Sequence, residues 1–249
     1  MSAEPKLSIV IPAYNEAERL PPTLDAVRAW LDAVGWDAEI VVVNDGSSDG
    51  TRDLLEGVAA ADPRVVPVTH ADNAGKGAAL VSGVAVARGE RLVFFDADLS
   101  YALDNLAFAM ARLDDGAELV IGARDLVAGD SRRDYGPLRR LASWTFNGLV
   151  ERALHLGIRD TQCGFKAFRT EVARPLFAAL TIGGFGFDVE LLFIARRWGL
   201  RIDLIPVVME ARGGSSVSVV RHSVRMARDV FAIRRRARRG GYPERPASA

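Results

Sequence analysis

The 249-residue sequence contains little cysteine and little histidine. Its single cysteine, Cys163, cannot form a disulfide within the chain, and it excludes a metal cluster built on cysteines. No apolar run approaches the roughly 18 to 20 residues that cross a membrane as a helix. Residues 1–6 lack the basic and then apolar segments of a signal peptide. We therefore expect a cytoplasmic protein, bound at most peripherally to the cytoplasmic face of the membrane.

The chain also lacks net charge, because 32 basic residues balance 32 acidic ones. The balance is uneven along the sequence, since residues 212–239 contain nine arginines and one aspartate. A basic C-terminal segment therefore follows an acidic body. With 49% hydrophobic residues and 23 glycines, the composition excludes a disordered chain and a collagen-like one.

Short apolar runs alternate with helical patterns through the first half of the sequence. These patterns predict strands at residues 7–12, 39–43, 65–68, 92–95 and 118–121, and helices at residues 16–34, from 51 onward and at 75–86. Further on they predict a loop at 123–137, helices at 138–156, 187–198 and 216–239, and a strand at 201–208. Repeated βα units predict a three-layer α/β fold with a mostly parallel sheet. We expect one domain over residues 1–211 and a basic amphipathic extension over residues 212–249.

Two carboxylates, Asp96 and Asp98, directly follow a predicted strand. Parallel sheets bind ligands at the carboxyl ends of their strands, where both side chains can turn toward one ion. Oxygen ligands without a nearby histidine suit Mg²⁺ or Mn²⁺ rather than Zn²⁺. The alternative is ordinary polarity at a strand end, with Asp98 or Ser100 capping the next helix.

Two glycine-containing turns carry further candidates. Residues 44–50 (NDGSSDG) lie between a strand and a helix, where they can receive a nucleoside or form an ordinary turn. They also contain the G-x-S-x-G pattern of a hydrolase with Ser48 as nucleophile, although no histidine has a recognisable setting. Residues 73–77 (NAGKG) open a predicted helix and are no Walker A loop. Lys76 there contacts a phosphate or ribose, or is a solvated lysine at a helix start.

Five motifs occur together in the order and spacing of a known family. They are LSIVIPAYNE at 7–16, VVVNDGSSDGT at 41–51, NAGKGAAL at 73–80, FFDADLS at 94–100 and IGAR at 121–124. Over residues 7–235 the chain resembles the family-2 glycosyltransferases, which have the GT-A fold. DTQCGFKAF at 160–168 and GFGFDVEL at 184–191 look like the dolichyl-phosphate β-glucosyltransferase branch of that family.

The resemblance implies a role for each matching residue. It makes residues 7–122 the nucleotide-sugar-binding half and residues 123–211 the acceptor side. Asp98 would be the main metal ligand, with Asp96 beside it. The nucleotide sugar would be bordered by Pro12, Tyr14, Glu16, Asp45, Lys76, Asp96 and Ala97, with Asp45 near the base. Arg124, Arg139 and Ser143 would hold the acceptor phosphate.

The resemblance implies transfer of glucose from UDP-glucose to a polyprenyl phosphate of the dolichyl type, with inversion and with help from Mg²⁺ or Mn²⁺. A phosphate monoester is largely ionised at pH 7, so its positioning matters more than its deprotonation. Asp160, Asp188 and Glu190 are therefore expected to orient groups rather than act as a base, and the alternative for Asp188 and Glu190 is an exposed helix face. The chain departs from its relatives at Tyr101-Ala102, where bacterial members commonly have Thr-Pro. It departs again at residues 214–217 (GSSV), which lack the usual lysine.

Other readings of the site remain open at this point. GDP-mannose is an alternative donor, because a carboxylate can accept a hydrogen bond from either uracil or guanine. A serine hydrolase using Ser48 and a sugar-nucleotide-binding module without catalysis are alternatives from other classes. The sequence does not indicate an oligomeric state.

The basic segment at 216–239 suggests a membrane contact. Val220, Val224, Ala227 and Phe231 have helical spacing among the arginines, and Val219, Met226, Val230 and Ile233 broaden the apolar face. Such a helix can lie in the interface of an anionic membrane, and residues 138–156 could add a second contact. The alternative is a helix packed on the domain with a solvated arginine tail. No nucleic-acid partner is expected.

Overall fold

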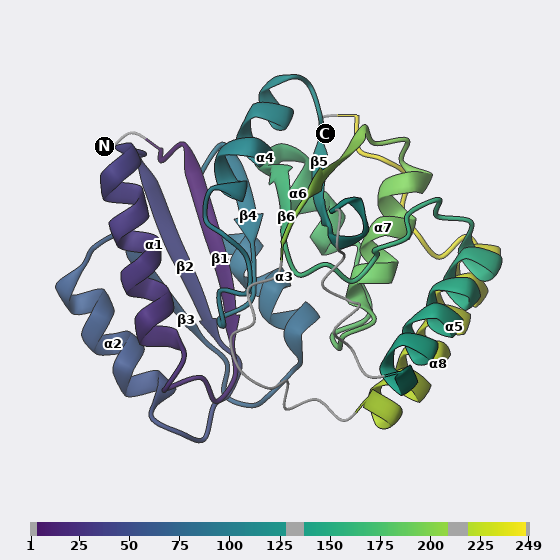
Figure 1. The fold of residues 1–249 in the computed structure, drawn as a ribbon, viewed down its shortest axis with the longest axis horizontal. Coiled ribbons are helices and arrows are strands. Elements are labelled where there is room, and N and C mark those ends of the chain that lie inside the picture. Colours follow the sequence, from purple (N-terminus) through teal and green to yellow (C-terminus); the bar gives the residue numbers. More distant parts are fainter. Residues whose placement is uncertain (1–3, 128–136, 209–218, 248–249) are drawn as a thin grey trace.

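A computed structural model describes residues 4–127, 137–208 and 219–247, and at 137–143 and 219–224 it describes the backbone alone. Its centre is one seven-stranded sheet with the order β3-β2-β1-β4-β6-β5-β7 (Figure 1). The strands are β1 (Leu7–Ala13), β2 (Ala38–Asn44), β3 (Val65–Thr69), β4 (Arg91–Phe94), β5 (Leu119–Ala123), β6 (Lys166–Arg169) and β7 (Ile202–Pro206). All neighbouring strands pair in parallel except β6, which is antiparallel to both β4 and β5. The predicted α/β fold with a mostly parallel sheet is confirmed.

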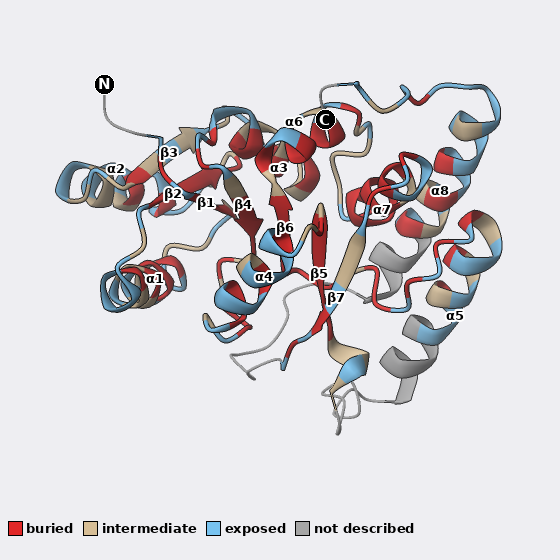
Figure 2. Ribbon diagram, turned by 90° about the horizontal axis from the view of Figure 1, so that it is seen from above, coloured by how far each residue is buried: buried red, intermediate tan, exposed pale blue. Residues whose placement is uncertain are grey.

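Helices cover both faces of this sheet. They are α1 (Leu20–Val34), α2 (Thr51–Ala61), α3 (Lys76–Val86), α4 (Asn105–Asp114), α5 (Pro137–Leu154), α6 (Thr170–Ala178), α7 (Phe187–Arg197) and α8 (Val219–Arg238), with a short 3₁₀ turn, η1 (Arg124–Leu126). Figure 2 shows α1 and α4 on one face and α3 and α6 on the other, with the buried strands between them. The α5 and α8 helices pack against each other at the end of the molecule nearest β7 (Figure 2). No helix within the described ranges is long and apolar enough to cross a membrane.

The first strands form where the sequence places them because they are buried on both faces. In β1 and β2 the central residues are valine and isoleucine with no exposed surface, as parallel strands between two helical layers require. Gly83 of α3 lets that helix approach closely, since a Cβ atom there would lie 2.5 Å from Cγ1 of Val10. The strand and helix order of residues 7–123 therefore follows from local hydrophobic pattern.

Helix α1 begins at Leu20, four residues later than its pattern predicts. Pro21 and Pro22 occupy its first turn, and proline fits only there because it has no N–H to donate to the preceding turn. Residues 16–19 instead form a turn in which the carbonyl of Glu16 accepts the N–H groups of Arg19 and Leu20. Glu16 is thereby freed from the helix and stays at the end of β1.

Helices α4 and α6 and strand β6 were not located by the sequence patterns. Strand β6 has only four residues, and it enters the sheet antiparallel between β4 and β5. Its Phe168 packs with Phe94 and Phe177, and Phe94 also packs with Phe187, with ring centroids 5.5–6.1 Å apart along this cluster. This aromatic cluster joins β4, β6, α6 and α7 into one core.

Candidate active site

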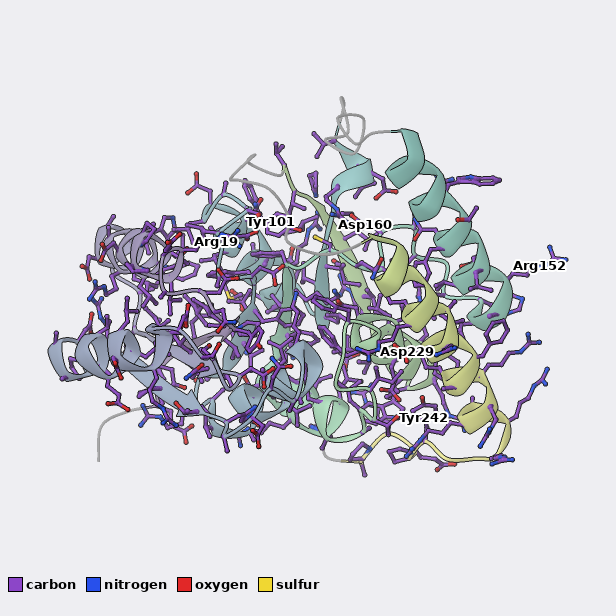
Figure 3. All side chains as sticks on the ribbon, turned by 90° about the horizontal axis from the view of Figure 1, so that it is seen from below. Arg19, Tyr101, Arg152, Asp160, Asp229 and Tyr242 are labelled. Atoms are coloured by element: carbon purple, nitrogen blue, oxygen red, sulfur yellow. The ribbon has the colours of Figure 1, made fainter. Side chains whose placement is uncertain are left out.

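The carboxyl ends of β1 and β4 lie beside each other at the point where the sheet order reverses. From β1 the chain runs outward to β2 and β3, and α3 then carries it back to β4 on the other side of β1. Ligands of open α/β sheets bind in the crevice at such a point. The turns that follow β1, β2 and β4 and the start of α3 all meet there, on the face seen in Figure 3.

The turns after β1 and β2 are tied together by hydrogen bonds. Asn15 has a positive φ of 54°, which asparagine tolerates better than most residues. Its side-chain oxygen accepts the N–H of Ser48 at 2.9 Å, and its own N–H donates to Oγ of Ser47 at 2.9 Å. The N–H of Glu16 donates to Oγ1 of Thr51 at 3.0 Å. These bonds fix the direction in which the chain leaves β1, and therefore the position of Glu16.

Asp45, at the end of β2, is buried and faces the turn that opens α3. Its carboxylate accepts the N–H of Ala74 at 3.0 Å and that of Gly75 at 2.8 Å. Nδ1 of His70 lies 2.7 Å from the same carboxylate, and Nε2 of that ring lies 2.9 Å from Oγ of Ser82. Asp45 therefore positions the residues just before Lys76.

Ser48 does not have the surroundings of a hydrolytic nucleophile. Its exposed hydroxyl donates to the side-chain oxygen of Asn15 at 3.4 Å. Within the described residues no histidine contacts Ser48, and His70 is engaged with Asp45 and Ser82. A serine nucleophile needs a base within hydrogen-bond reach, so this geometry does not favour the hydrolase alternative.

Lys76 and Asp96 form an ion pair at the centre of the site. Nζ of Lys76, at the first position of α3, lies 2.5 Å from Oδ1 of Asp96 after β4. Burial lowers the pKa of Lys76, but the carboxylates of Asp96, Asp188 and Asp98 outweigh it and hold the pKa above its usual range. Gly164 permits the pair, because a Cβ atom there would collide with the Asp96 carboxylate. Lys76 is therefore a fixed positive charge at the carboxyl ends of β1 and β4.

Asp98 and Glu16 add negative charge beside that pair. Asp98 accepts the N–H of Ser100 at 3.1 Å and forms no ion pair in the described part of the chain. Burial raises the pKa of Glu16; Arg19, 3.5 Å away, opposes this, and Asp98 and Asp96 add to it. Asp96 and Asp98 therefore lie beside the largely buried Lys76, and Glu16 lies close to both aspartates and beside the half-exposed Arg19.

This excess of carboxylate oxygens suits a divalent cation whose coordination is completed by a bound ligand. The described residues contain no preformed cluster of three metal-binding side chains. Mg²⁺ is commonly held by one or two carboxylates together with substrate phosphates, and Asp96 and Asp98 fit that mode. The donor set thus agrees with Mg²⁺ or Mn²⁺ in the presence of a phosphorylated ligand.

Asp188 and Asp160, by contrast, are paired with cations inside the protein. Oδ1 of Asp188 lies 2.5 Å from Nζ of Lys166, which also donates to the carbonyl of Cys163 at 2.7 Å. Burial raises the pKa of Asp188, while Lys166 and Lys76 oppose the rise. Asp160 accepts Nη2 of Arg124 at 2.6 Å and Nε at 2.7 Å. Burial lowers the pKa of Arg124, and its bonds to Asp160 more than reverse this.

Glu190 is buried and forms no ion pair within the described residues, and its hydrogen-bond donors are neutral groups. Its carboxylate accepts the N–H groups of Thr181 and Ile182, each at 2.8 Å, and the hydroxyl of Tyr242 at 2.7 Å. Asp188 and Glu190 are respectively 4% and 0% exposed. The alternative that these two lie on an exposed helix face is therefore wrong.

The other candidates are distributed as follows. Pro12 is half-buried in β1, Tyr14 is exposed just after it, and the carbonyl of buried Ala97 accepts the hydroxyl of Thr23 at 2.6 Å. Arg139 and Ser143 lie at the start of α5, and their side chains are outside the described part of the structure.

Sequence reasoning missed two residues that shape this site. Lys166 is buried in β6 and holds Asp188, and the hydroxyl of Tyr101 accepts the N–H of Gly164 at 3.2 Å. Figure 3 labels Tyr101 and Asp160 on the face where the strands end. The available signal for Lys166 was a charge inside the apolar run at 163–168, since a buried lysine needs a carboxylate partner.

Comparison with known proteins gives matches over most of the chain. Residues 8–177 match the family model described as Glycosyl transferase family 2. The chain is 35% identical over 245 residues to a dolichyl-phosphate beta-glucosyltransferase of Drosophila melanogaster, which covers 92% of this chain and 74% of that protein.

Two solved structures share the fold at lower identity. Mannosyl-3-phosphoglycerate synthase from Rubrobacter xylanophilus superposes with a TM-score of 0.69 at 22% identity, covering 98% of this chain and 78% of that one. Glucosyl-3-phosphoglycerate synthase from Mycobacterium tuberculosis, in complex with Mn²⁺, UDP-glucose and phosphoglyceric acid, gives a TM-score of 0.64 at 21% identity. That match covers 96% of this chain and 81% of the other.

Proposed function

Because this chain belongs to glycosyl transferase family 2 and has the GT-A fold, we propose that it transfers glucose from UDP-glucose to a polyprenyl phosphate of the dolichyl type, with inversion. The observation that carries the proposal is the crowding of Glu16, Asp96 and Asp98 at the ends of β1 and β4, where Lys76 pairs with Asp96. The named activity of the Drosophila relative supports the acceptor, and the UDP-glucose complex of the mycobacterial structure supports the donor.

On the donor side, the proposal assigns the diphosphate to the ends of β1 and β4. Asp98, with Asp96, would hold a Mg²⁺ or Mn²⁺ ion, which when bound stabilises the negative charge that develops on the leaving UDP. Lys76 adds a second positive charge, and Asp96 fixes its position. Tyr14, Pro12 and Glu16 would border the nucleoside, and Asp45 would shape the turn against which the base lies.

On the acceptor side, the reaction needs a positioned phosphate more than a base. A phosphate monoester has a second pKa near 6, so its oxygen is already largely ionised at pH 7. Asp188 and Asp160 are committed to Lys166 and Arg124, and Glu190 to backbone N–H groups. We assign all three carboxylates to orienting neighbouring groups. The lipid phosphate would meet Arg124, whose plane Asp160 fixes, together with Arg139 and Ser143.

The lipid acceptor would lie in a bilayer, and we propose that α8 carries the protein to an anionic membrane surface. Met226, Val230 and Ile233 are buried, so that part of the expected apolar face packs on the protein and is not available to lipid. Phe231 is 56% exposed beside an open groove of about 810 Å³ between α8 and residues 181–182. Arg228, Arg235 and Arg239 line this groove, and each basic residue near such a surface contributes about 1 kcal/mol.

A transfer assay with a panel of donors tests the reaction. Purified protein is given a short-chain polyprenyl phosphate, Mn²⁺ and either UDP-glucose or GDP-mannose, and the lipid product is identified. We expect glucosyl lipid from UDP-glucose and loss of product in excess chelator. Mannosyl lipid from GDP-mannose would instead support the alternative donor, and binding of UDP-glucose without transfer would support a binding module.

Sedimentation with liposomes tests the membrane contact separately. We expect the full chain to bind anionic liposomes more than neutral ones, and salt to weaken the binding. Replacing Arg235 and Arg239 by alanine should reduce binding, whereas replacing Arg112 on α4 should not. Equal binding to both kinds of liposome, unaffected by salt, would reject this electrostatic contact.

A further inference from the structure

The start of α3, which carries Lys76, is capped by backbone from another part of the chain. Gly75 precedes the helix without a side-chain cap. The carbonyl of Gly183, between α6 and α7, accepts the N–H of Gly77 at 2.7 Å and that of Ala78 at 3.2 Å. The N–H groups of a first helical turn have no partner within the helix, so this carbonyl supplies one. The position of Lys76 therefore depends on where the chain holds Gly183.

The approach of these two segments is close, and glycine makes it possible. A Cβ atom on Gly75 would lie 2.5 Å from the carbonyl oxygen of Gly183, and one on Gly77 would lie 2.7 Å from that of Ile182. Gly75 also has a φ of +98°, which L side chains rarely adopt. A small displacement of residues 181–183 would consequently move the first turn of α3.

Glu190, in the first turn of α7, holds residues 181–183 in place. One carboxylate oxygen accepts the N–H groups of Thr181 and Ile182, and the other lies 2.5 Å from the hydroxyl of Thr181. A buried carboxylate that lacks an ion pair needs all of these donors, because each lost bond leaves charge desolvated. Glu190 therefore orders the segment that caps α3.

The last donor to Glu190 comes from the C-terminal tail beyond α8. Tyr242 is 4% exposed and donates its hydroxyl to the carboxylate at 2.7 Å. The tail is fixed around it, since Nε1 of Trp198 donates to the carbonyl of Pro243 at 3.0 Å and Nε of Arg236 to that of Gly241 at 2.8 Å. Figure 3 shows Tyr242 toward the C-terminal end of α8, well away from the labelled Asp160 and Tyr101.

We infer that Tyr242 and Glu190 are positioning residues for the donor site, acting through residues 181–183 on the first turn of α3 and on Lys76. The inference rests on the proposed function for its ligand, the diphosphate of a nucleotide sugar. It adds that the C-terminal tail, far from the sheet ends in sequence, supports the segment that positions Lys76 for that diphosphate. Both residues act through residues 181–183 and not by direct contact with the ligand.

The decisive variant is Tyr242→Phe, which removes one hydroxyl and keeps the ring in its place beside Phe193. We expect hydrogen exchange at the amides of Gly77 and Ala78 to become about two- to tenfold faster. This is the effect of losing one hydrogen bond from the chain of bonds that links Tyr242, Glu190, residues 181–183 and the first turn of α3. The KM for UDP-glucose should rise by a similar factor, while the KM for the lipid phosphate stays unchanged. Val58→Ala on α2 is the control for a general loss of stability.

A second variant tests whether the effect passes through Glu190. In a Glu190→Gln background, Tyr242→Phe should add little to the change in exchange rate, because the effects of substitutions within one hydrogen-bond network are not additive. Unchanged exchange at Gly77 and Ala78 in Tyr242→Phe would overturn the inference. So would equal rises in both KM values, or changes no larger than those of the stability control. The exchange measurement needs no turnover, so it decides this inference even if UDP-glucose proves not to be the donor.

Discussion

The site contains two groups of carboxylates that differ in how their charge is balanced. Glu16, Asp96 and Asp98, the strand-end carboxylates, are partly exposed and share Lys76 and a half-exposed Arg19 between them. Asp160 and Asp188, the paired carboxylates, are buried, and each has its own cation in Arg124 or Lys166. The first group carries excess negative charge at a crevice, and the second carries none.

The strand-end carboxylates therefore need an added cation to balance their charge, whereas the charge of the paired carboxylates is already balanced within the protein. Crowded carboxylates repel one another, which is visible in the raised pKa of Glu16 caused by burial and then by Asp98 and Asp96. A divalent ion and a diphosphate relieve that repulsion together. The paired carboxylates need no ligand, and so they serve to hold Lys166, Arg124 and the loops around them.

The largest effect should come from breaking a buried pair. Lys166→Met leaves Asp188 buried without its cation, and we expect a loss of about 3–5 kcal/mol in the free energy of unfolding, measured in urea. Lys76→Met should cost less, since its partner Asp96 is 39% exposed and can be hydrated. Equal losses for the two variants would remove the distinction between the two groups.

The next effect should be on catalysis alone. Asp98→Asn removes a charge that forms no ion pair in the described residues, so the fold should keep its stability while transfer falls about 10²- to 10³-fold. Asp37→Asn, at an exposed position before β2, is the matched control. Full activity of the Asp98 variant, or of the unmodified protein in excess chelator, would contradict the metal assignment.

Arg124 should separate the acceptor from the donor. Arg124→Lys keeps the positive charge but loses the two-point contact with Asp160, because a lysine cannot form it. We expect the KM for the lipid phosphate to rise about tenfold, with UDP affinity unchanged. Arg112→Lys, on α4, serves as the control. A fall in UDP affinity of the same size would show that the roles are assigned to the wrong substrates.

Much of the fold was accessible from sequence because its first half is built from local signals. Strands β1 and β2 are apolar runs, and the prolines of α1 mark its first turn. Strand β6 was not accessible, because four residues carry no periodicity and its lysine is balanced by Asp188, 22 positions later. The apolar face of α8 was visible as a pattern, yet the sequence does not show that Met226, Val230 and Ile233 pack inward.

The site, like the fold, has one part that could be predicted from the sequence and one part that could not. Asp96 and Asp98 follow a strand, and their placement at its end could be predicted from that alone. The part played by Tyr242 could not, since its partner Glu190 lies 52 positions away and the motif that contains Glu190 gives no sign of Tyr242. Long-range hydrogen bonds to a buried carboxylate leave no periodic trace, and they become visible only in three dimensions.

The smallest effect should be a pH-dependent gain in stability on removing one strand-end charge. The pKa of Glu16 is raised above the ordinary value of 4.5 in the folded protein, so its charge costs stability at pH 7, and this cost disappears as pH falls through the folded pKa. Glu16→Gln should therefore raise the Tm at pH 7 by about 1–2 °C, and by less at pH values below the folded pKa. Glu18→Gln, at an exposed neighbouring position, should change neither value. A Tm that falls at pH 7 would mean that the pair with Arg19 outweighs the repulsion from Asp96 and Asp98, and that this end of the sheet carries no excess charge for a cation to balance.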